Sequence, residues 1–411
     1  MIFPVSLLAL CAGLALTASV KAETLRLQPL LREAVTMHPE VRQRRGEIQT
    51  GNLDLDAAKW SRFPSASAGI ESASSGSTGV LTLRQPLWTG GKITGQIDSA
   101  TAKLAINQAS LVETQQSVLQ RSAQTYFDIL RYETRLKIVR DNESEHKHLL
   151  EIIQRRVKSE VSPGTDETQA MARYRQVISE RIQVELQLAS ARSSLEQMLG
   201  RKVDVKPMVK PIAMGTLTEA TLLDMAMAYS PERQRLRAQI ESIDAEVALA
   251  ESKLKPEVFV AMQTRTGTLN SGQDRNRYYV GVEMQTGAGL SALSGIQSVL
   301  SRKESEREKL AAAERALSNQ IRATWAEMNA LKDQLEPVRA LLTSSEDVVA
   351  SYLRQFQVGR RSWLEVLNAQ REKFQAYNTL ADIENPLEYA KLRLLLQAGQ
   401  VSADSLHLLN E

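Results

Sequence analysis

The stretch Ala34–Ser72, AVTMHPEVRQRRGEIQTGNLDLDAAKWSRFPSASAGIES, decides the fold, because a second version of it follows later in the chain. The second version is Ala226–Thr264, AMAYSPERQRLRAQIESIDAEVALAESKLKPEVFVAMQT. Pro39 of the first stretch corresponds to Pro231 of the second at a spacing of 192 residues, and the next proline of each stretch keeps this spacing. Two prolines in the same register indicate an internal duplication.

After these stretches, corresponding residues lie farther apart, since Gly289 follows Gly90 by 199 residues. The seven extra residues are therefore expected between Pro256 and Gly289. This pattern predicts two structural repeats, which we place at 23–209 and 210–400. The alternative is chance similarity between alanine-rich helical segments, which leaves the paired prolines unexplained.

Each repeat is expected to contain a helix, a β-hairpin, a very long helix, a tip and a further helix. Pro39 and Pro231 suit the first turn of a helix, where no N–H partner is needed, and Ser230 is a good N-cap residue. Helices are expected to end before the next proline, because the residue before a proline disfavours the helical region. The expected elements with numbered bounds are the hairpin 64–88, the helices 91–158 and 165–200, the helix 217–255, the hairpin 257–286, and the helices 290–357 and 362–398.

The second hairpin shows the alternation of strands that have one apolar and one polar face. Its strand-like runs lie near 257–266 and 278–285, and those of the first hairpin lie near 65–72 and 80–88, with Gly- and Ser-containing turns between them. Alternating faces over about ten residues suit the wall of a membrane barrel, and a small soluble β-domain is the alternative. The apolar positions of the second hairpin are Val258, Val260, Met262, Val280, Val282 and Met284, and the polar ones include Gly281, Glu283 and Gln285.

Four strands per chain cannot close a membrane barrel, because about eight is the smallest workable number. Open strand edges are excluded in lipid by the cost of unpaired backbone groups. The barrel would therefore have to be shared, and a homotrimer would supply twelve strands. Trp88, Tyr278 and Tyr279 are expected at the membrane interfaces.

The helices 91–158 and 290–357 are unusually long, on the order of 100 Å each at 1.5 Å per residue. The second contains a heptad seam typical of coiled-coil packing. Pro337 is expected to kink this helix or to break it locally. The seam consists of Ile321, Met328, Leu335, Leu342, Val349 and Phe356, with Leu317, Leu331, Val338 and Tyr352 at its second position.

Residues 1–22 form an apolar stretch that ends in a small residue, which predicts a cleaved secretory signal peptide. The single cysteine, Cys11, lies within it, and a mature chain without cysteine suits an oxidising compartment. Lipidation of Cys11 is the alternative. No later apolar run reaches the length of a membrane-spanning helix, and residues 401–411 are expected to form a C-terminal tail.

Composition and motifs argue against other classes of function. Charged residues make up 24% of the chain, but the net charge is only +3 and no basic stripe alternates with aromatics, so no nucleic-acid partner is expected. The chain has no P-loop, no HExxH motif, no nucleophile elbow and no cysteine pair. Hence neither enzymatic activity nor a cofactor is expected. His146 and His148 face different sides of a helix, and we expect exposed polar residues there instead of metal ligands.

Local motifs resemble those of the TolC family of outer-membrane efflux and secretion ducts. The stretch RQFQVGRRSWLEVLNAQ, Arg354–Gln370, resembles the second tip turn of that family and the start of its last helix. PLWTGGK, Pro86–Lys92, resembles the exit from strand to helix, and the HPE and SPE sequences resemble the openings of the two halves. The resemblance covers essentially the whole mature chain.

The resemblance implies a mainly α fold with a small β part. The duplicated protomers would build a trimeric α-barrel in the periplasm and a shared 12-stranded transmembrane β-barrel. A periplasmic adaptor would dock on the tips, and Gly359 suits a turn that needs a positive φ. The matching turn of the first half has Glu160 at the aligned position, which puts symmetric docking in doubt. The implied docking residues are Val358, Gly359, Arg360, Val161 and Ser162.

The resemblance also implies a gate at the periplasmic end of the duct. Arg361 falls where the family places a gate arginine, and Asp166 falls where its acidic partner lies, so the two would form a latch. Glu365 would contribute a carboxylate to a ring at the narrow entrance. Asn368 occupies the next such position without a charge and would weaken the ring. Ordinary solvated helix charges are the alternative for each of these residues.

The function implied by the resemblance is that of a passive exit duct in the outer membrane. An adaptor would connect it to an inner-membrane ABC transporter or another pump. The tip sequence VSPGTD, 161–166, resembles secretion-type members and favours type I protein secretion. Multidrug or small-molecule efflux is the alternative cargo assignment. A structural periplasmic coiled-coil protein is the alternative of a different class.

Overall fold

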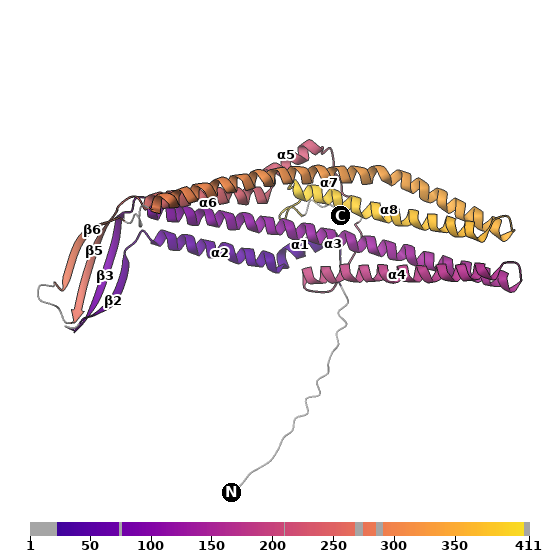
Figure 1. The fold of residues 1–411 in the computed structure, drawn as a ribbon, viewed down its shortest axis with the longest axis horizontal. Helices are drawn as coiled ribbons and strands as arrows, with labels where there is room; N and C mark the ends of the chain where they lie inside the picture. Colours follow the sequence, from indigo (N-terminus) through magenta and orange to yellow (C-terminus); the bar gives the residue numbers. More distant parts are fainter. Residues whose placement is uncertain (1–22, 74–75, 209, 268–273, 285–290, 407–411) are drawn as a thin grey trace, which may run out of the picture.

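The computed structural model shows an elongated molecule with a β-sheet at one end and two helical tips at the other (Figure 1). The predicted signal peptide and Cys11 lie outside the residues that the structure describes, as does Gln285. The described residues are 23–73, 76–208, 210–267, 274–284 and 291–406. Within them the chain is mainly helical, which confirms the predicted fold class.

The internal duplication appears in the bounds of the helices themselves. Before the hairpins, corresponding helices start and end 192 residues apart, and after the hairpins the long helices start and end 199 residues apart. The seven extra residues therefore fall in the second hairpin region, as predicted. The helices are α1 (Leu27–Met37), α2 (Pro39–Trp60), α3 (Lys92–Lys158) and α4 (Gly164–Leu199) of the first repeat, and α5 (Glu219–Tyr229), α6 (Pro231–Ser252), α7 (Ser291–Gln357) and α8 (Trp363–Gln397) of the second.

The single helix predicted at 217–255 is wrong, because the structure divides it into α5 and α6 at Ser230. The Ser230 hydroxyl accepts a hydrogen bond from the Arg233 N–H at 3.3 Å, and Pro231 occupies the first turn of α6. A serine N-cap followed by proline starts a new helix instead of continuing the old one. In the first repeat His38 has the same place, since its Nδ1 accepts from the Glu40 N–H at 3.3 Å.

Pro337 does not break α7, which runs continuously through this residue. Figure 1 shows α7 changing direction in its C-terminal half. Such a bend is the expected response of a long helix to an internal proline, which removes one backbone hydrogen bond and crowds the preceding turn. A second internal proline, Pro386, lies inside α8 in the same way and was not predicted to do so.

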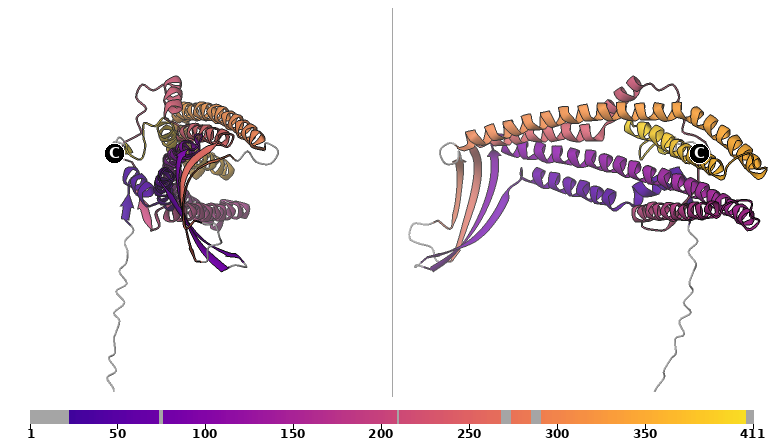
Figure 2. Two further views of the ribbon diagram at one scale, coloured as in Figure 1. Left: turned by 90° about the vertical axis from the view of Figure 1, so that its left-hand side faces the viewer. Right: turned by 45° about the vertical axis from the view of Figure 1, so that its right-hand side comes forward.

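The helices pack side by side in two arrangements along the molecule. Next to the sheet the order is α2, α3, α6, α7, and toward the tips it is α4, α3, α8, α7 (Figure 2). α3 and α7 therefore run through both halves, while the shorter helices pair with them at either end. Long helices with few breakers can be stabilised only by neighbours of this kind.

The main sheet contains both hairpins, and its strand order is β2-β3-β5-β6 with all neighbours antiparallel. The pairing of β3 with β5 joins segments that lie far apart in the sequence and leaves β2 and β6 at the edges. β3 begins earlier than predicted because Thr78 and Gly79 pair on both sides. The strands are β2 (Ser65–Ala73), β3 (Gly76–Trp88), β5 (Glu257–Gly267) and β6 (Asn276–Glu283).

Two very short strands were not predicted. β1 (Glu23–Leu25) pairs in parallel with β4 (Val203–Val205) and ties the start of the described chain to the end of the first repeat. Strands of three residues are too short to give an alternating pattern in a sequence.

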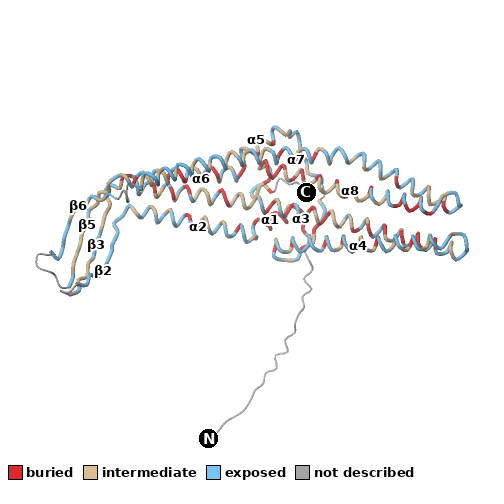
Figure 3. Tube along the Cα trace, in the orientation of Figure 1, coloured by how far each residue is buried: buried red, intermediate tan, exposed pale blue. Residues whose placement is uncertain are grey.

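The largest core cluster lies in the middle of the molecule, where α1, α3, α4 and the end of α8 meet (Figure 3). Leu30, Tyr126 and Leu392 are fully buried there. A second cluster lies between the two tips, and a third joins α5, α7 and α8. None of the helices in the described ranges is both long enough and apolar enough to cross a membrane.

Candidate functional site

The main sheet has one apolar face, and this face is exposed. The register pairs Val258 with Val282 and Val260 with Val280, so these side chains lie on the same face. Val280 is 67% exposed, although valine is ordinarily a core residue. The face is contiguous over all four strands, which marks an interaction with an apolar environment. Its other large exposed members are Ile70, Leu81, Leu83, Trp88 and Tyr278.

The opposite face of the sheet is polar. Arg84 donates to Glu283 at 3.0 Å and stacks over the Phe259 ring at 3.6 Å. Tyr279 also lies here, with its ring 6.2 Å from that of Phe259. Placing Tyr279 beside Tyr278 at a membrane interface is therefore wrong, because successive strand residues point to opposite faces.

Both tips turn with the same backbone geometry. In the first tip the Val161 N–H donates to the Arg156 carbonyl at 2.9 Å, and Glu160 has a φ of 60°. In the second tip the Arg360 N–H donates to the Gln355 carbonyl at 2.9 Å, and Gly359 has a φ of 76°. This is the Schellman ending of a helix, in which one residue adopts a left-handed conformation. The missing glycine at Glu160 has therefore not changed the turn.

Replacing Glu160 with Gly is expected to raise the free energy of unfolding by about 1 kcal/mol, because a left-handed conformation costs an L-residue roughly 1–2 kcal/mol and costs glycine almost nothing. Chemical denaturation of the purified protein would measure the change. Glu160→Ala is the control, since it removes the carboxylate but retains the backbone cost. Equal stability of the two variants would contradict the assignment of backbone strain.

The side chains at the tips use the same pair of positions with exchanged chemistry. The Arg156 guanidinium donates from Nε to the Ser162 hydroxyl at 3.2 Å. At the corresponding positions 199 residues later, the Arg361 Nε donates to the Gln355 amide oxygen at 3.2 Å. An arginine thus braces each turn, once from the end of the incoming helix and once from the start of the outgoing one.

Arg361 is held entirely by residues of its own hairpin. Its guanidinium forms an ion pair with Glu365 and lies 4.4 Å over the Tyr352 ring. Glu365 in turn accepts from the Ser362 N–H and hydroxyl, both at 2.9 Å, and completes a capping box at the start of α8. These bonds, first those from Ser362 and then the one from Arg361, lower the pKa of Glu365 to about 2.

The predicted pair of Arg361 with Asp166 is not formed within the chain. Asp166 occupies the third position of α4, which corresponds to Glu365 in α8, and the preceding N-cap is Pro163. In the part of the chain that the structure describes, the Asp166 carboxylate makes no ion pair. Asn368 is exposed one turn after Glu365. The sequence could not show that Arg361 would instead choose a partner from its own helix.

The predicted docking residues surround two exposed turns whose bases are firmly packed. Val161 is 61% exposed and Val358 is 70% exposed. Gly359 and Arg360 are exposed beside Val358, and Ser162 is half-buried by its contact with Arg156. Below the turns, the guanidinium of Arg156 lies 4.7 Å over the Phe356 ring, which joins the two tips.

A polar seam between α3 and α8 was not predicted from the sequence. Lys373 bonds Glu145 at 2.7 Å, and the buried Gln370 donates to Asn142 at 3.4 Å. His146 is also buried here, so the expectation that it is exposed is wrong. Desolvation lowers the pKa of His146 and favours its neutral form. Only the packing of helices from different repeats buries these residues, and a single helix pattern cannot reveal it.

The exposed apolar face of the sheet, the polar face behind it and the long helical hairpins are the features of a channel-forming protomer of the outer membrane. The chain belongs to the outer membrane efflux protein family, whose model matches residues 30–201 and 222–400. This family includes TolC and related ducts, and it confirms the resemblance found in the sequence. The protein therefore resides in the outer membrane and extends into the periplasm.

Relatives with established names are distant in sequence. The outer membrane protein TolC of Vibrio cholerae is 23% identical and covers 74% of this chain and 73% of its own. The alkaline protease secretion protein AprF of Pseudomonas aeruginosa is 21% identical, over 80% of this chain and 70% of its own. The cobalt-zinc-cadmium resistance protein CzcC of Cupriavidus metallidurans is 22% identical, over 73% and 72%.

Solved structures share the fold over most of the chain. A membrane protein from Pseudomonas aeruginosa has a TM-score of 0.80 at 16% identity and covers 90% of this chain and 93% of its own. The outer membrane protein VceC from Vibrio cholerae has a TM-score of 0.78 at 16% identity, over 91% and 96%. At this identity the likeness establishes the fold alone.

Proposed function

We propose that three copies of this chain form a passive exit duct, with a shared barrel in the outer membrane and a helical tunnel in the periplasm. The observation that supports this best is the four-stranded sheet with one exposed apolar face and two open edges, β2 and β6. In lipid both edges need partners, and four strands cannot bend round to meet each other. Pairing β6 of one copy with β2 of the next closes a twelve-stranded barrel.

The duct would take its energy from an inner-membrane pump, because members of this family act together with periplasmic adaptors and such pumps. The exposed turns at Val161 and Val358 are the proposed docking points for the adaptor. Glu160 and Gly359 give the two turns the same backbone course, which supports docking on both tips. The chain itself would carry out no catalysis.

The gate residues take revised roles in this proposal. Arg361 and Glu365 neutralise each other and stabilise the second tip, so the carboxylate ring would be weak. Asp166 has no partner in the described part of its own chain and remains available to a cation of a neighbouring copy. Asn368 adds a polar but uncharged group to the entrance.

For the cargo we favour protein export by type I secretion. The tip sequence 161–166 resembles secretion-type members, and AprF is named for secretion of alkaline protease. Efflux of small molecules or metal ions is the second candidate, which the family description and the resistance protein CzcC favour.

Two measurements on the native protein test this proposal. Membrane fractionation and crosslinking are expected to give trimers in the outer membrane, and the purified trimers are expected to conduct ions in planar bilayers. Recovery as stable single chains in the soluble periplasmic extract would instead support a structural coiled-coil protein. Comparison of secreted proteins with drug and metal sensitivity in a deletion strain then separates the two cargo classes.

A further inference from the structure

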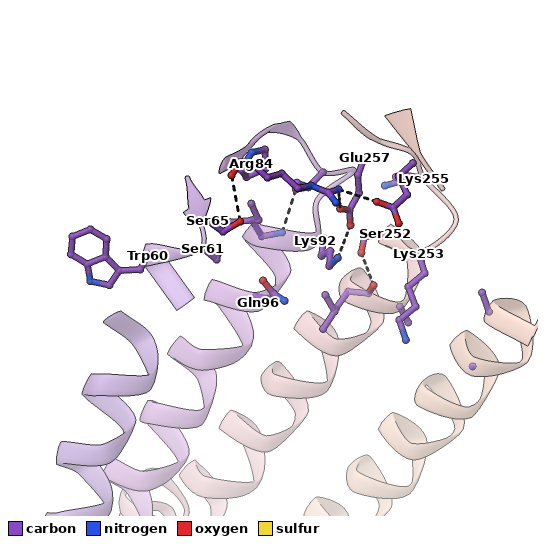
Figure 4. A pocket seen from close by; sticks show the side chains of 18 of the residues that line it. Trp60, Ser61, Ser65, Arg84, Lys92, Gln96, Ser252, Lys253, Lys255 and Glu257 are labelled. Carbon is purple, nitrogen blue, oxygen red and sulfur yellow. Dashed lines mark hydrogen bonds and ion pairs between the residues drawn. The ribbon is translucent and has the colours of Figure 1, made fainter. Parts of the chain in front are cut away.

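A pocket of about 950 Å³ lies at the junction of the sheet with the long helices (Figure 4). It opens on the polar side of the sheet, because Arg84, Glu257 and Glu283 of that face line it. The first turns of α3 and α7 and the last turn of α6 complete the wall. Segments from both repeats thus build one hollow.

Cations outnumber carboxylates in this pocket. Its charged residues are four cations, Arg84, Lys92, Lys253 and Lys255, and two carboxylates, Glu257 and Glu283. Both carboxylates already have partners, since Lys92 bonds Glu257 at 2.6 Å and Arg84 bonds Glu283 at 3.0 Å. In the described chain Lys253 and Lys255 form no ion pair, and both are exposed to the pocket. Each chain therefore carries a surplus of two positive charges here.

The backbone adds to this positive potential. α3 begins in the pocket wall, and its N-cap Gly91 offers no side-chain acceptor to the first N–H groups. Free N–H groups at a helix start attract anions. Lys255 is also fixed in place: a Cβ on Gly90 would lie 2.5 Å from the Cβ of Lys255, so only glycine permits this approach.

Helix stabilisation explains only part of the cluster. Lys253 is the C-cap residue of α6, where a cation complements the helix dipole. Lys255 lies beyond the helix and has no such role. Two neighbouring unpaired cations repel each other, so their placement in one pocket calls for an anion.

We propose that this pocket is a binding site for multivalent oxyanions, such as phosphate groups or clustered carboxylates of a water-soluble molecule. A lipid headgroup does not fit, because the pocket lies on the face of the sheet opposite the apolar one. The site's position on the inner wall of a duct rests on the proposed function, whereas its capacity to bind anions does not. In a trimer, three such pockets would surround the passage where the tunnel enters the barrel and would draw acidic cargo forward.

The test is calorimetric titration of the full-length protein in a non-ionic detergent with inositol hexakisphosphate. The wild type is expected to bind, and binding should weaken with added salt. Replacing both lysines, Lys253→Gln with Lys255→Gln, is expected to weaken binding by about tenfold or more, as expected for the loss of two charge-assisted contacts. The control pair Lys147→Gln with Lys158→Gln removes the same charge from exposed positions of α3 and should bind like the wild type.

The absence of binding by the wild type, or equal weakening in both double variants, would overturn the site. Bilayer recordings separate this result from the proposed function. A wild type that conducts but binds no polyanion retains the duct and loses the site. A wild type that binds through these lysines but never conducts retains the site and contradicts the duct.

Discussion

Val280→Arg is expected to abolish stable insertion into the outer membrane. Val280 lies at the centre of the exposed apolar face, in register with Val260. An arginine facing lipid near the middle of a bilayer costs about 2–4 kcal/mol per copy. In a trimer the cost arises three times around one barrel. We expect loss of the protein from the outer-membrane fraction and loss of trimers on crosslinking.

The matched control for this change is Gln263→Arg, which introduces the same side chain on the polar face of the adjacent strand. That face is proposed to border water, so insertion should be close to normal. If both variants insert equally well, the assignment of the two faces fails. If neither does, the strands tolerate no added bulk and a lysine at each position would repeat the comparison with a slimmer charge.

Arg361→Ala is expected to raise single-channel conductance severalfold. Arg361 joins Gln355 and Tyr352 at the end of α7 to Glu365 at the start of α8, so its loss loosens the whole second tip. Arg360→Ala is the control, because the neighbouring arginine is exposed and forms no ion pair in the described chain. Equal conductance of the two variants would remove Arg361 from the gate.

Asp166→Ala separates a latch between copies from a brace within one tip. If the Asp166 carboxylate bonds a neighbouring copy in the closed duct, its removal should also raise the conductance. An unchanged conductance would restrict the latch to the second tip.

The same tip should respond to pH only in strong acid. The pKa of Glu365 is lowered from 4.5 to about 2 by its bonds to Ser362 and Arg361. A lowered pKa means that the ionised form contributes stability at pH values above 4.5, and that this contribution is lost as the pH falls toward 2. The conductance should therefore stay constant between pH 8 and pH 5 and rise below about pH 4. A transition near pH 6 would contradict the role of Glu365.

The sequence by itself determined the repeat and the local conformations. Two covalent spacings were enough to relate the helices of the two halves, because prolines and caps act on their own neighbours. The faces of the second hairpin followed from the two-residue period of a strand. Gly359 likewise indicated a left-handed turn, because glycine adopts a positive φ without steric cost.

Only the tertiary structure decided which segments meet. The order β2-β3-β5-β6 joins hairpins from different repeats, and it creates both the continuous apolar face and the basic pocket behind it. The same holds for the burial of His146 and for the choice of Glu365 over Asp166 by Arg361. Local patterns depend on residues a few positions apart, whereas pairing and burial depend on the free energy of contacts between distant segments. No single stretch of sequence contains that information.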